Sequence, residues 1–354
     1  MHFAALNPAQ DLLADLAADL DDVHSILIPG GTSQLLDEVA MLHPGAMIHW
    51  IPTDLSTAFI TSDSVVVHND VGDIAINQGS IDLTVLEVVG DRDLSRRWLA
   101  LVRHVARPGG VLLVAGPNDL GIKSAIGDAG EAIGPAVVED SRRHNRVAHV
   151  AIPPVPPVPP DWALEDGIAP GTWSRFAVRE SGIDLLFDSL PGVFSADHLD
   201  DGTALVLDHL DVPADASVLD VGCGSGVIGV VAGRRGAGLV TMTDINLLAI
   251  AAAERNADLS EAPVVVMAGD VYSAVGDERF DLIVSNPPFH QGKDVNHDVP
   301  QRLIAEARYF LKPGGRLVLV ANAFLPYDRV MQEHFREVDT LAATRQFRVL
   351  SAKR

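Results

Sequence analysis

The chain has 354 residues, of which 47% are hydrophobic and 21% charged, with a formal net charge of −22 and a single cysteine. This length suits two domains, and the apolar fraction excludes a mainly disordered chain. The lone Cys223 excludes an internal disulfide and a cysteine-based structural zinc site, and it suits the reducing cytoplasm.

Membrane and secretory segments are not expected in this sequence. No uninterrupted apolar run reaches about 18 residues, the minimum for a spanning helix. The first residues lack the basic and apolar segments of a secretory signal. The negative net charge argues against a nucleic-acid partner, because phosphate attracts basic surfaces. It does not exclude one, since a polyanion needs only one local basic face, and arginine supplies most of the positive charge.

Short apolar strands alternate with helical stretches along the chain, and the pattern occurs twice. Segments of the first half reappear in the same order about 190 to 205 positions later. The pairs are Ser25–Gly31 with Ser217–Cys223, Pro52–Leu55 with Met242–Ile245, Val65–Val71 with Val264–Val271, Ile81–Val85 with Phe280–Val284, and Arg107–Val114 with Lys312–Leu319. This order indicates an internal duplication of a doubly wound α/β unit with a Rossmann-like sheet.

A proline-rich run separates the two copies. Residues 152–160 contain six prolines in nine positions, which excludes a helix or an interior strand and favours extended polyproline II. We interpret it as a semi-rigid spacer, with a ligand for a proline-recognition module as the alternative. The expected domains are 1–151 and 162–354, joined by a linker over 152–161.

The second copy gives the clearest elements. Helices are expected over 227–235 and 301–311, and a closing hairpin over 338–341 and 346–350. Buried strands are expected at Ser217–Val221, Leu239–Thr243, Val264–Met267, Leu282–Ser285 and Leu317–Val320.

A glycine-rich loop follows the first of these strands and opens a helix. Its residues Asp220, Gly222, Gly224 and Gly226 allow a tight turn and close approach of a ligand to the backbone. A dinucleotide fingerprint would need glycine at position 227, which is valine. The spacing resembles instead the first motif of class I S-adenosylmethionine-dependent methyltransferases.

Two further acids follow later strands of this copy. Asp244 ends the second strand, where a carboxylate can bind ribose hydroxyls, and Asp270 ends the third, where an adenine amino group would lie. The alternative interpretation of such acids is a helix cap or a solvated loop residue. Their occurrence at successive strand ends beside the glycine loop favours a cofactor site.

The most specific motif follows the fourth strand and reads Asn286-Pro287-Pro288-Phe289-His290. It resembles the Asn-Pro-Pro-aromatic motif of methyltransferases that act on amines in planar, conjugated systems. The Asn286 side-chain oxygen and the Pro287 carbonyl can accept the two amine hydrogens, and the prolines stiffen the loop. Phe289 can stack on a base. The alternative is a structural proline turn before a core phenylalanine.

Pro288 and His290 are the expected substrate contacts of the same loop. His290 can donate to a base or a phosphate, or be incidental. Cys223 lies inside the glycine loop without a histidine partner nearby in sequence, and we interpret it as a packing residue.

Three further segments narrow the resemblance. They are Leu-Pro-Gly-Val-Phe-Ser at 190–195, Leu-Asp-Asp-Gly-Thr at 199–203, and Ala-Asn-Ala-Phe-Leu-Pro-Tyr at 321–327. Together with the two motifs above, they resemble the ribosomal RNA guanine-N2 methyltransferases built from two tandem domains. The resemblance covers nearly the whole chain.

The resemblance implies a degenerate first domain and an active second domain. It implies S-adenosylmethionine as cofactor and ribosomal RNA, free or in a ribosomal particle, as substrate. It also implies that the Pro-Gly-Val-Phe-Ser segment closes over the cofactor, so that Phe194, Ser195 and Thr203 line the pocket. No metal is expected, because class I methyl transfer needs none and the histidines show no ligand spacing.

The first copy departs from the pattern. Ile28 stands where Asp220 stands in the second copy, and residues 86–89, Leu-Glu-Val-Val, replace the Asn-Pro-Pro-Phe run. Asp54 and Asp70 are retained, but without the amine acceptors catalysis is not expected there. The basic cluster of Arg142, Arg143 and Arg146 is a candidate contact for RNA phosphates, with a solvated charge run as the alternative.

The sequence therefore predicts a cytoplasmic S-adenosylmethionine-dependent enzyme that methylates the N2 amine of a guanine in ribosomal RNA. Two alternatives stay open at this point. One is a methyltransferase for another planar amine, either adenine N6 or a protein glutamine. The other is a cofactor-binding ribosome-assembly factor without catalysis. The ribosomal subunit, the nucleotide and the oligomeric state are not fixed by the sequence, which is compatible with a monomer.

Overall fold

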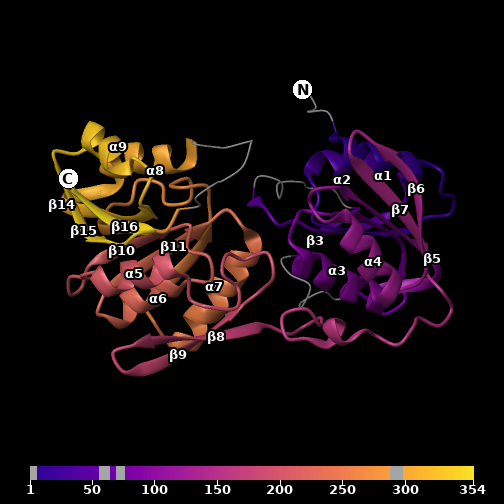
Figure 1. The fold of residues 1–354 in the computed structure, drawn as a ribbon, viewed down its shortest axis with the longest axis horizontal. Coiled ribbons are helices and arrows are strands. Elements are labelled where there is room, and N and C mark those ends of the chain that lie inside the picture. The colour runs from indigo at the N-terminus through magenta and orange to yellow at the C-terminus, as the bar shows by residue number, and fades with distance from the viewer. Residues whose placement is uncertain (1–5, 56–63, 69–75, 288–297) are drawn as a thin grey trace. The chain divides into compact units, whose positions relative to one another are not determined.

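Each half of the chain builds a seven-stranded sheet, and the two sheets have the same strand order (Figure 1). The computed structural model describes residues 6–55, 64–68, 76–287 and 298–354. Two units divide the chain: unit 1 comprises residues 1–174 and 190–192, and unit 2 comprises 175–189 and 193–354.

The strands of each sheet can be followed in spatial order. Unit 1 has β3 (Val65–Val67), β2 (Met47–Ile51), β1 (Ser25–Pro29), β4 (Ile81–Glu87), β5 (Ala106–Pro117), β7 (Asn145–Ala151) and β6 (Ala136–Arg142). Unit 2 has β12 (Val264–Ala268), β11 (Leu239–Asp244), β10 (Ser217–Val221), β13 (Phe280–Ser285), β14 (Leu311–Asn322), β16 (Phe347–Lys353) and β15 (Glu337–Ala343). In each sheet the first five strands are parallel and the last two form an antiparallel hairpin. The predicted duplication of a doubly wound unit is confirmed.

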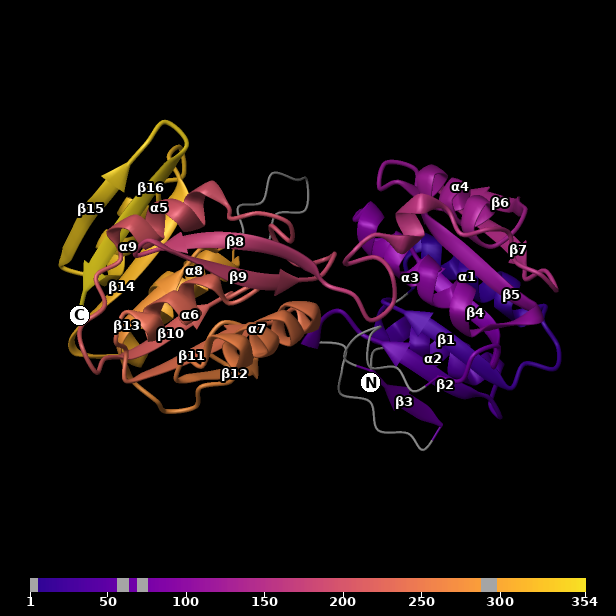
Figure 2. The same ribbon diagram turned by 90° about the horizontal axis from the view of Figure 1, so that it is seen from below.

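Helices cover both faces of each sheet (Figure 2). Unit 1 contains α1 (Pro8–Ala18), α2 (Ser33–Leu42), α3 (Arg92–Val105) and α4 (Ile122–Ala132). Unit 2 contains α5 (Asp201–His209), α6 (Val227–Arg234), α7 (Leu247–Ser260), α8 (Asp298–Phe310) and α9 (Tyr327–His334), with a separate hairpin of β8 (Ser174–Glu180) and β9 (Ile183–Ser189).

The strands of unit 2 alternate their side chains between two buried layers. Val218 packs in the layer that includes α5, α6 and α7, whereas the next residue, Leu219, packs in the layer that includes α8 and α9. Figure 1 shows these two groups of helices on opposite sides of the strands. Such strands are apolar at nearly every position, because both faces of a parallel sheet are covered. This explains why the sequence located them.

The observed elements match the sequence predictions for unit 2 in position. The two helices, the closing hairpin and all five strands lie where they were expected. The prediction that the strand at Val264–Met267 is buried is wrong. It is β12, at the edge of the sheet, where Val265 is 45% exposed and Met267 is 37% exposed. An apolar run does not reveal which strand lacks a neighbour.

The segment after the proline-rich run packs on unit 1. Trp162 is buried, donates a hydrogen bond from its Nε1 to Glu131 Oε2 at 3.1 Å, and lies 5.0 Å from the Arg96 guanidinium. The buried Arg97 side chain donates to the Gly167 carbonyl at 2.6 Å. The prolines therefore do not end unit 1, which continues to Ser174.

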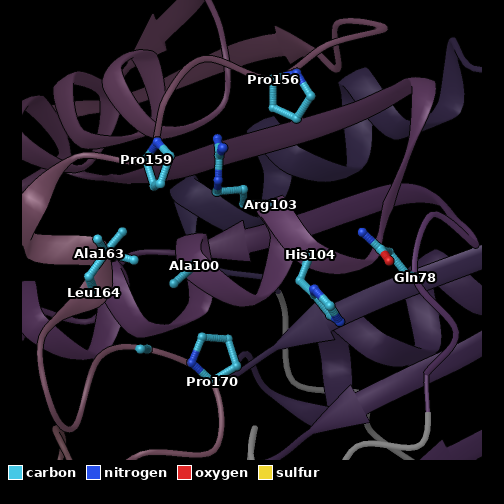
Figure 3. A pocket seen from close by; sticks show the side chains of 10 residues that line it. Gln78, Ala100, Arg103, His104, Pro156, Pro159, Ala163, Leu164 and Pro170 are labelled. Atoms are coloured by element: carbon cyan, nitrogen blue, oxygen red, sulfur yellow. The ribbon is translucent and has the colours of Figure 1, made fainter.

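A pocket of 470 Å³ lies where the proline-rich segment folds back on α3 (Figure 3). Its lining includes Pro156, Pro159 and Pro170, together with Ala100 and Arg103 of α3. Among the residues that the structure describes, no helix combines the length and apolar character needed to cross a membrane.

Candidate active site

The glycine loop joins β10 to α6 at the carboxyl edge of the second sheet. Gly222, Gly224 and Gly226 have φ angles of +71°, +55° and +83°, a region that side chains other than glycine rarely adopt. The backbone N–H of Gly222 donates to the Thr243 carbonyl at 2.8 Å, which ties the loop to β11. A Cβ atom added at Gly222 or Gly224 would meet no described atom within 4 Å. The loop thus offers an open backbone surface to a ligand.

Asp220 lies beneath this loop and is completely buried. Its Oδ2 accepts a hydrogen bond from the Gly229 backbone N–H at 2.9 Å, whereas its Oδ1 accepts none from the described residues. Burial raises the pKa of Asp220 to about 7, and the nearby Asp244 carboxylate adds to the effect. A buried carboxyl with one unused oxygen suits a site that receives a cationic or hydrogen-donating ligand.

The other two predicted cofactor acids stand at the ends of the next strands. Asp244 ends β11, and its Oδ2 accepts from the Gly224 backbone N–H at 2.9 Å. Asp270 follows β12 and forms an ion pair with Arg302 of α8 at 2.9 Å. The fold therefore brings Asp220 and Asp244 to the glycine loop, and it gives Asp270 a cationic partner that the sequence did not indicate.

The equivalent loop of unit 1 is filled by protein. A Cβ atom added at Gly30 would lie 2.6 Å from the buried Trp98 ring of α3. The Trp50 indole donates to the Gly30 carbonyl at 2.9 Å, and Ile28 occupies the position of the buried acid. The glycine loop of unit 2 therefore has room for a nucleoside cofactor, whereas the equivalent loop of unit 1 does not.

Asn286 follows β13 at the same edge of the sheet. The preceding Ser285 is buried and its hydroxyl donates to the Val221 carbonyl at 2.7 Å, which places the start of the motif beside the glycine loop. The Asn286 amide nitrogen donates to Asp200 Oδ2 at 3.0 Å and to Thr203 Oγ1 at 2.9 Å. Its Oδ1 is buried and accepts no hydrogen bond within the described parts of the chain. Pro287 is buried next to it.

The remaining predicted pocket residues have mixed positions. Phe194 is 64% exposed, and the Ser195 hydroxyl donates to the His198 carbonyl at 2.8 Å. Thr203, assigned above to the cofactor pocket, has its hydroxyl in contact with Asn286. Pro288, Phe289 and His290 lie outside the described residues, as does Asp70 of the first copy.

The arginine cluster of unit 1 lies at the β6–β7 turn. Arg142 is paired with Asp15 at 2.5 Å and with Asp140 at 2.7 Å, so its charge is already neutralised. Arg143 is exposed at the turn with a φ of +47°, and Arg146 is half-buried in β7. The expectation that this cluster contacts RNA stays a prediction, and Arg142 and Arg143 are its exposed members.

Cys223 has an environment that suits packing. Burial raises the pKa of its thiol, and the nearby Asp244 and Asp220 carboxylates act in the same direction. The thiolate, which is the nucleophilic form, is thereby disfavoured. Within the ranges described by the structure, no cluster of three or more histidine, cysteine, aspartate or glutamate side chains could hold a metal ion.

Sequence reasoning missed Asp200 and Arg302. Asp200 precedes α5 and caps it by accepting from the Thr203 backbone N–H at 2.8 Å. An aspartate before a helical pattern is a recognisable capping signal. That signal does not reveal the second contact, because Asn286 lies 86 positions away in the chain.

Comparison with known proteins gives three concordant results. Residues 184–351 match the family model described as Methyltransferase small domain. The chain is 40% identical over 243 residues to the ribosomal RNA small subunit methyltransferase C of Pasteurella multocida, covering 68% of this chain and 70% of that protein. It is 35% identical over 277 residues to the protein of the same name from Haemophilus influenzae, covering 78% and 80%.

A solved structure agrees with these relatives. It is the 16S rRNA N2 G1207 methyltransferase (RsmC) of T. thermophilus in complex with AdoMet and guanosine. It is 26% identical in sequence, with a TM-score of 0.81, and the match covers 98% of this chain and 92% of that chain.

Proposed function

Because the chain belongs to the ribosomal RNA small subunit methyltransferase C family, we propose that it modifies one guanine of the small-subunit RNA. The reaction is S-adenosylmethionine-dependent methylation of the exocyclic N2 amine of guanine in ribosomal RNA. The T. thermophilus relative is named for G1207 of 16S rRNA, and the proposed target here is the counterpart of that nucleotide.

The observation that carries the proposed site is the unused acceptor of Asn286. Buried polar atoms in folded proteins nearly always have a hydrogen-bond partner. The Asn286 Oδ1 accepts from no described residue, although the amide nitrogen of the same side chain has two partners. An amine with two N–H hydrogens is the kind of group that would satisfy it.

The residues of unit 2 then bind two ligands, the cofactor and the guanine base. When bound, S-adenosylmethionine supplies a methyl group on a positively charged sulfur, and the carbon–sulfur bond breaks with its electron pair retained by sulfur. Gly222 and Gly224 offer the cofactor an open backbone surface without side chains, and Asp244 and Asp270 bind its ribose and base. Asn286 Oδ1 and the Pro287 carbonyl accept the amine hydrogens, which directs the nitrogen lone pair toward the methyl carbon.

No strong base is required by this arrangement. The nitrogen lone pair forms the new bond to carbon, and the nitrogen releases one proton to water during or after transfer. Asn286 Oδ1 stabilises the positive charge that develops on the nitrogen and its hydrogens. Phe289 stacks on the base that has been taken out of its helix.

Unit 1 has a supporting role in this proposal. Glu87 stands at the end of β4, where Asn286 follows β13, and both of its oxygens already accept hydrogen bonds from Asn7 and Gln10. Both Glu87 oxygens are thus bound to side chains of unit 1, whereas Asn286 Oδ1 has no partner among the described residues. RNA contacts through Arg143 and Arg146 suit this unit, and the enzyme acts on ribosomal RNA or a ribosomal particle in the cytoplasm.

A methyl-transfer assay tests the proposal. The full chain and S-adenosylmethionine with a labelled methyl group are incubated with small-subunit particles, deproteinised small-subunit RNA, large-subunit RNA, or a glutamine peptide. We expect label only in small-subunit RNA, at one guanine, recovered as N2-methylguanosine. Label on adenine or on the peptide would overturn the assignment of the acceptor.

A further inference from the structure

We propose that Asp200 and Thr203 are positioning residues that hold the Asn286 amide in one orientation, with its Oδ1 reserved for the substrate amine. This inference rests on the proposed role of Asn286. Its basis is a hydrogen-bond pattern that joins the first turn of α5 to the end of β13.

An asparagine amide can usually turn over, because its oxygen and nitrogen have nearly the same size. Here both N–H hydrogens of Asn286 are used, one by Asp200 Oδ2 at 3.0 Å and one by Thr203 Oγ1 at 2.9 Å. After a turn, Oδ1 would face the Asp200 carboxylate, and two acceptors cannot hydrogen-bond to each other. The two partners thus favour a single orientation.

Asp200 is itself fixed by the helix that it caps. The same Oδ2 atom accepts from the Thr203 backbone N–H at 2.8 Å, and the Asp200 backbone is extended with φ −63° and ψ 140°. Thr203 lies on the first turn of α5 and is buried. Both partners of the amide therefore belong to a rigid helix start rather than to a loop.

Unit 1 provides an internal comparison. Asp82 in β4 and Asp281 in β13 each accept from the first backbone N–H of the neighbouring strand, at Ser25 and Ser217. Five positions after these matched aspartates stand Glu87 and Asn286, so the two residues are equivalent. The sequence alignment above, which set Leu86 against Asn286, is therefore wrong by one position.

In both units, side chains at the start of a helix (α1 or α5) hydrogen-bond to the residue at the end of a strand (β4 or β13). The donor and acceptor roles are exchanged between the two units. In unit 1 the cap residue Asn7 donates to Glu87 Oε1 at 2.7 Å, and Gln10 donates to Glu87 Oε2 at 2.8 Å. In unit 2 the strand-end residue donates and the helix start accepts. Only the second direction leaves a buried oxygen without a partner. The reversal supports a functional reason for the pattern in unit 2.

The Asp200 carboxylate has a second effect. A negative group that accepts from the amide nitrogen increases the negative charge on the amide oxygen, because hydrogen-bonded groups polarise one another. Oδ1 then binds the amine hydrogens more strongly as positive charge develops on the nitrogen. Asp200 and Thr203 act through Asn286 and are not expected to touch the substrate.

A matched pair of variants at position 203 tests the proposal. Thr203→Val removes the hydroxyl and keeps the shape, whereas Thr203→Ser keeps the hydroxyl. In single-turnover assays on small-subunit particles with saturating cofactor, Thr203→Val should lower the methylation rate about tenfold, and Thr203→Ser should retain most of it. Cofactor affinity by calorimetry and the melting temperature should change little between the two.

A second pair addresses the cap residue. Asp200→Ser can still cap α5 but is too short to reach the amide, and Asp200→Asn can place an oxygen where Oδ2 lies. We expect a larger loss of rate for Asp200→Ser than for Asp200→Asn. If Asp200→Ser fails to fold, the position 203 pair decides the question.

The double variant Thr203→Val with Asn286→Ala shows whether Thr203 acts through Asn286. It should be no slower than Asn286→Ala alone, because Thr203 acts through Asn286. A full additional loss would show that Thr203 acts elsewhere and would overturn the positioning role. A slow Asn286→Ala beside a Thr203→Val of wild-type rate would do the same. If Asn286→Ala itself methylates at wild-type rate, the proposed function of Asn286 fails first.

Discussion

The carboxylate of Asp244 accepts a hydrogen bond from the backbone N–H of Gly224 at 2.9 Å. Its other oxygen accepts from the Asn246 backbone N–H at 2.9 Å, at the start of α7. One side chain thus connects the strand end, the glycine loop and the following helix. The residue that we expect to bind the ribose also holds the loop that approaches the cofactor.

Replacing Asp244 should therefore weaken cofactor binding in two ways. Asp244→Ala removes the ribose acceptor and releases the Gly224 N–H, and we expect a loss of roughly 1–3 kcal/mol in binding free energy. Calorimetric titration of the purified chain with S-adenosylmethionine measures it, with circular dichroism as the control for folding. Unchanged affinity in Asp244→Ala would remove this residue from the site.

The first unit should bind no cofactor. Trp98 fills the space at Gly30, and Ile28 replaces the buried acid, so the full chain should bind one S-adenosylmethionine per molecule. Calorimetry gives this stoichiometry directly. Two sites per chain, or one site that persists after the glycine loop of unit 2 is disabled, would contradict the assignment of unit 1 as degenerate.

The extent of unit 1 can be tested with fragments. A fragment of residues 1–174 keeps Trp162 and Ile168, both buried, and the carbonyl acceptor of Arg97. A fragment of residues 1–150 loses these buried side chains and the Gly167 and Thr172 carbonyl acceptors of Arg97. We expect the shorter fragment to have a free energy of unfolding lower by about 3 kcal/mol or more. Equal urea midpoints and slopes for the two fragments would place the end of the unit before the prolines, as the sequence predicted.

Asp220 should make stability depend on pH. Its pKa is raised from 3.8 to about 7 in the folded chain by burial, so the neutral form is favoured in the native state. Between pH 4 and pH 7 the unfolded chain binds fewer protons at this residue, and stability must fall as the pH rises. The contribution is complete below about pH 4 and is lost as the pH rises through about 7.

Asp220→Asn removes this titration. Without cofactor, we expect the wild-type chain to lose roughly 2–4 kcal/mol relative to Asp220→Asn between pH 4.5 and pH 7.5. Urea unfolding of both proteins at the two pH values measures the difference. Parallel changes in the two proteins would show that Asp220 is ionised in the folded chain at neutral pH.

The sequence located most of unit 2 because its strands are buried on both faces. Apolar runs such as Ser217–Val221, followed by a glycine, and Leu239–Thr243, followed by an acid, gave the strands and their functional edge together. The sequence did not reveal that β12 lies at the edge of the sheet, because its apolar run carries no sign that a neighbouring strand is missing. The fold of unit 1 followed from the repeat, although its own motifs are weaker.

The site was only partly predictable. Motif spacing predicted site roles for Asp220, Asp244 and Asn286, and the structure places all three at or directly after strand ends, at one edge of the sheet. The contact of Asn286 with Asp200 joins residues 86 positions apart, and no local rule relates them. The packing of the Trp98 ring against Gly30 was equally unpredictable, because only the packed structure shows which helix residue reaches the loop.

We propose that this chain methylates the N2 amine of a guanine in small-subunit RNA through Asn286. The most direct test of this proposal is mass spectrometry of RNA nucleosides and mapped fragments from a strain that lacks the protein. We expect one N2-methylguanosine to be missing from the small-subunit RNA, restored by the wild-type chain and at most weakly by Asn286→Ala. An unchanged methylation profile in the deletion strain, or full restoration by Asn286→Ala, would contradict the account.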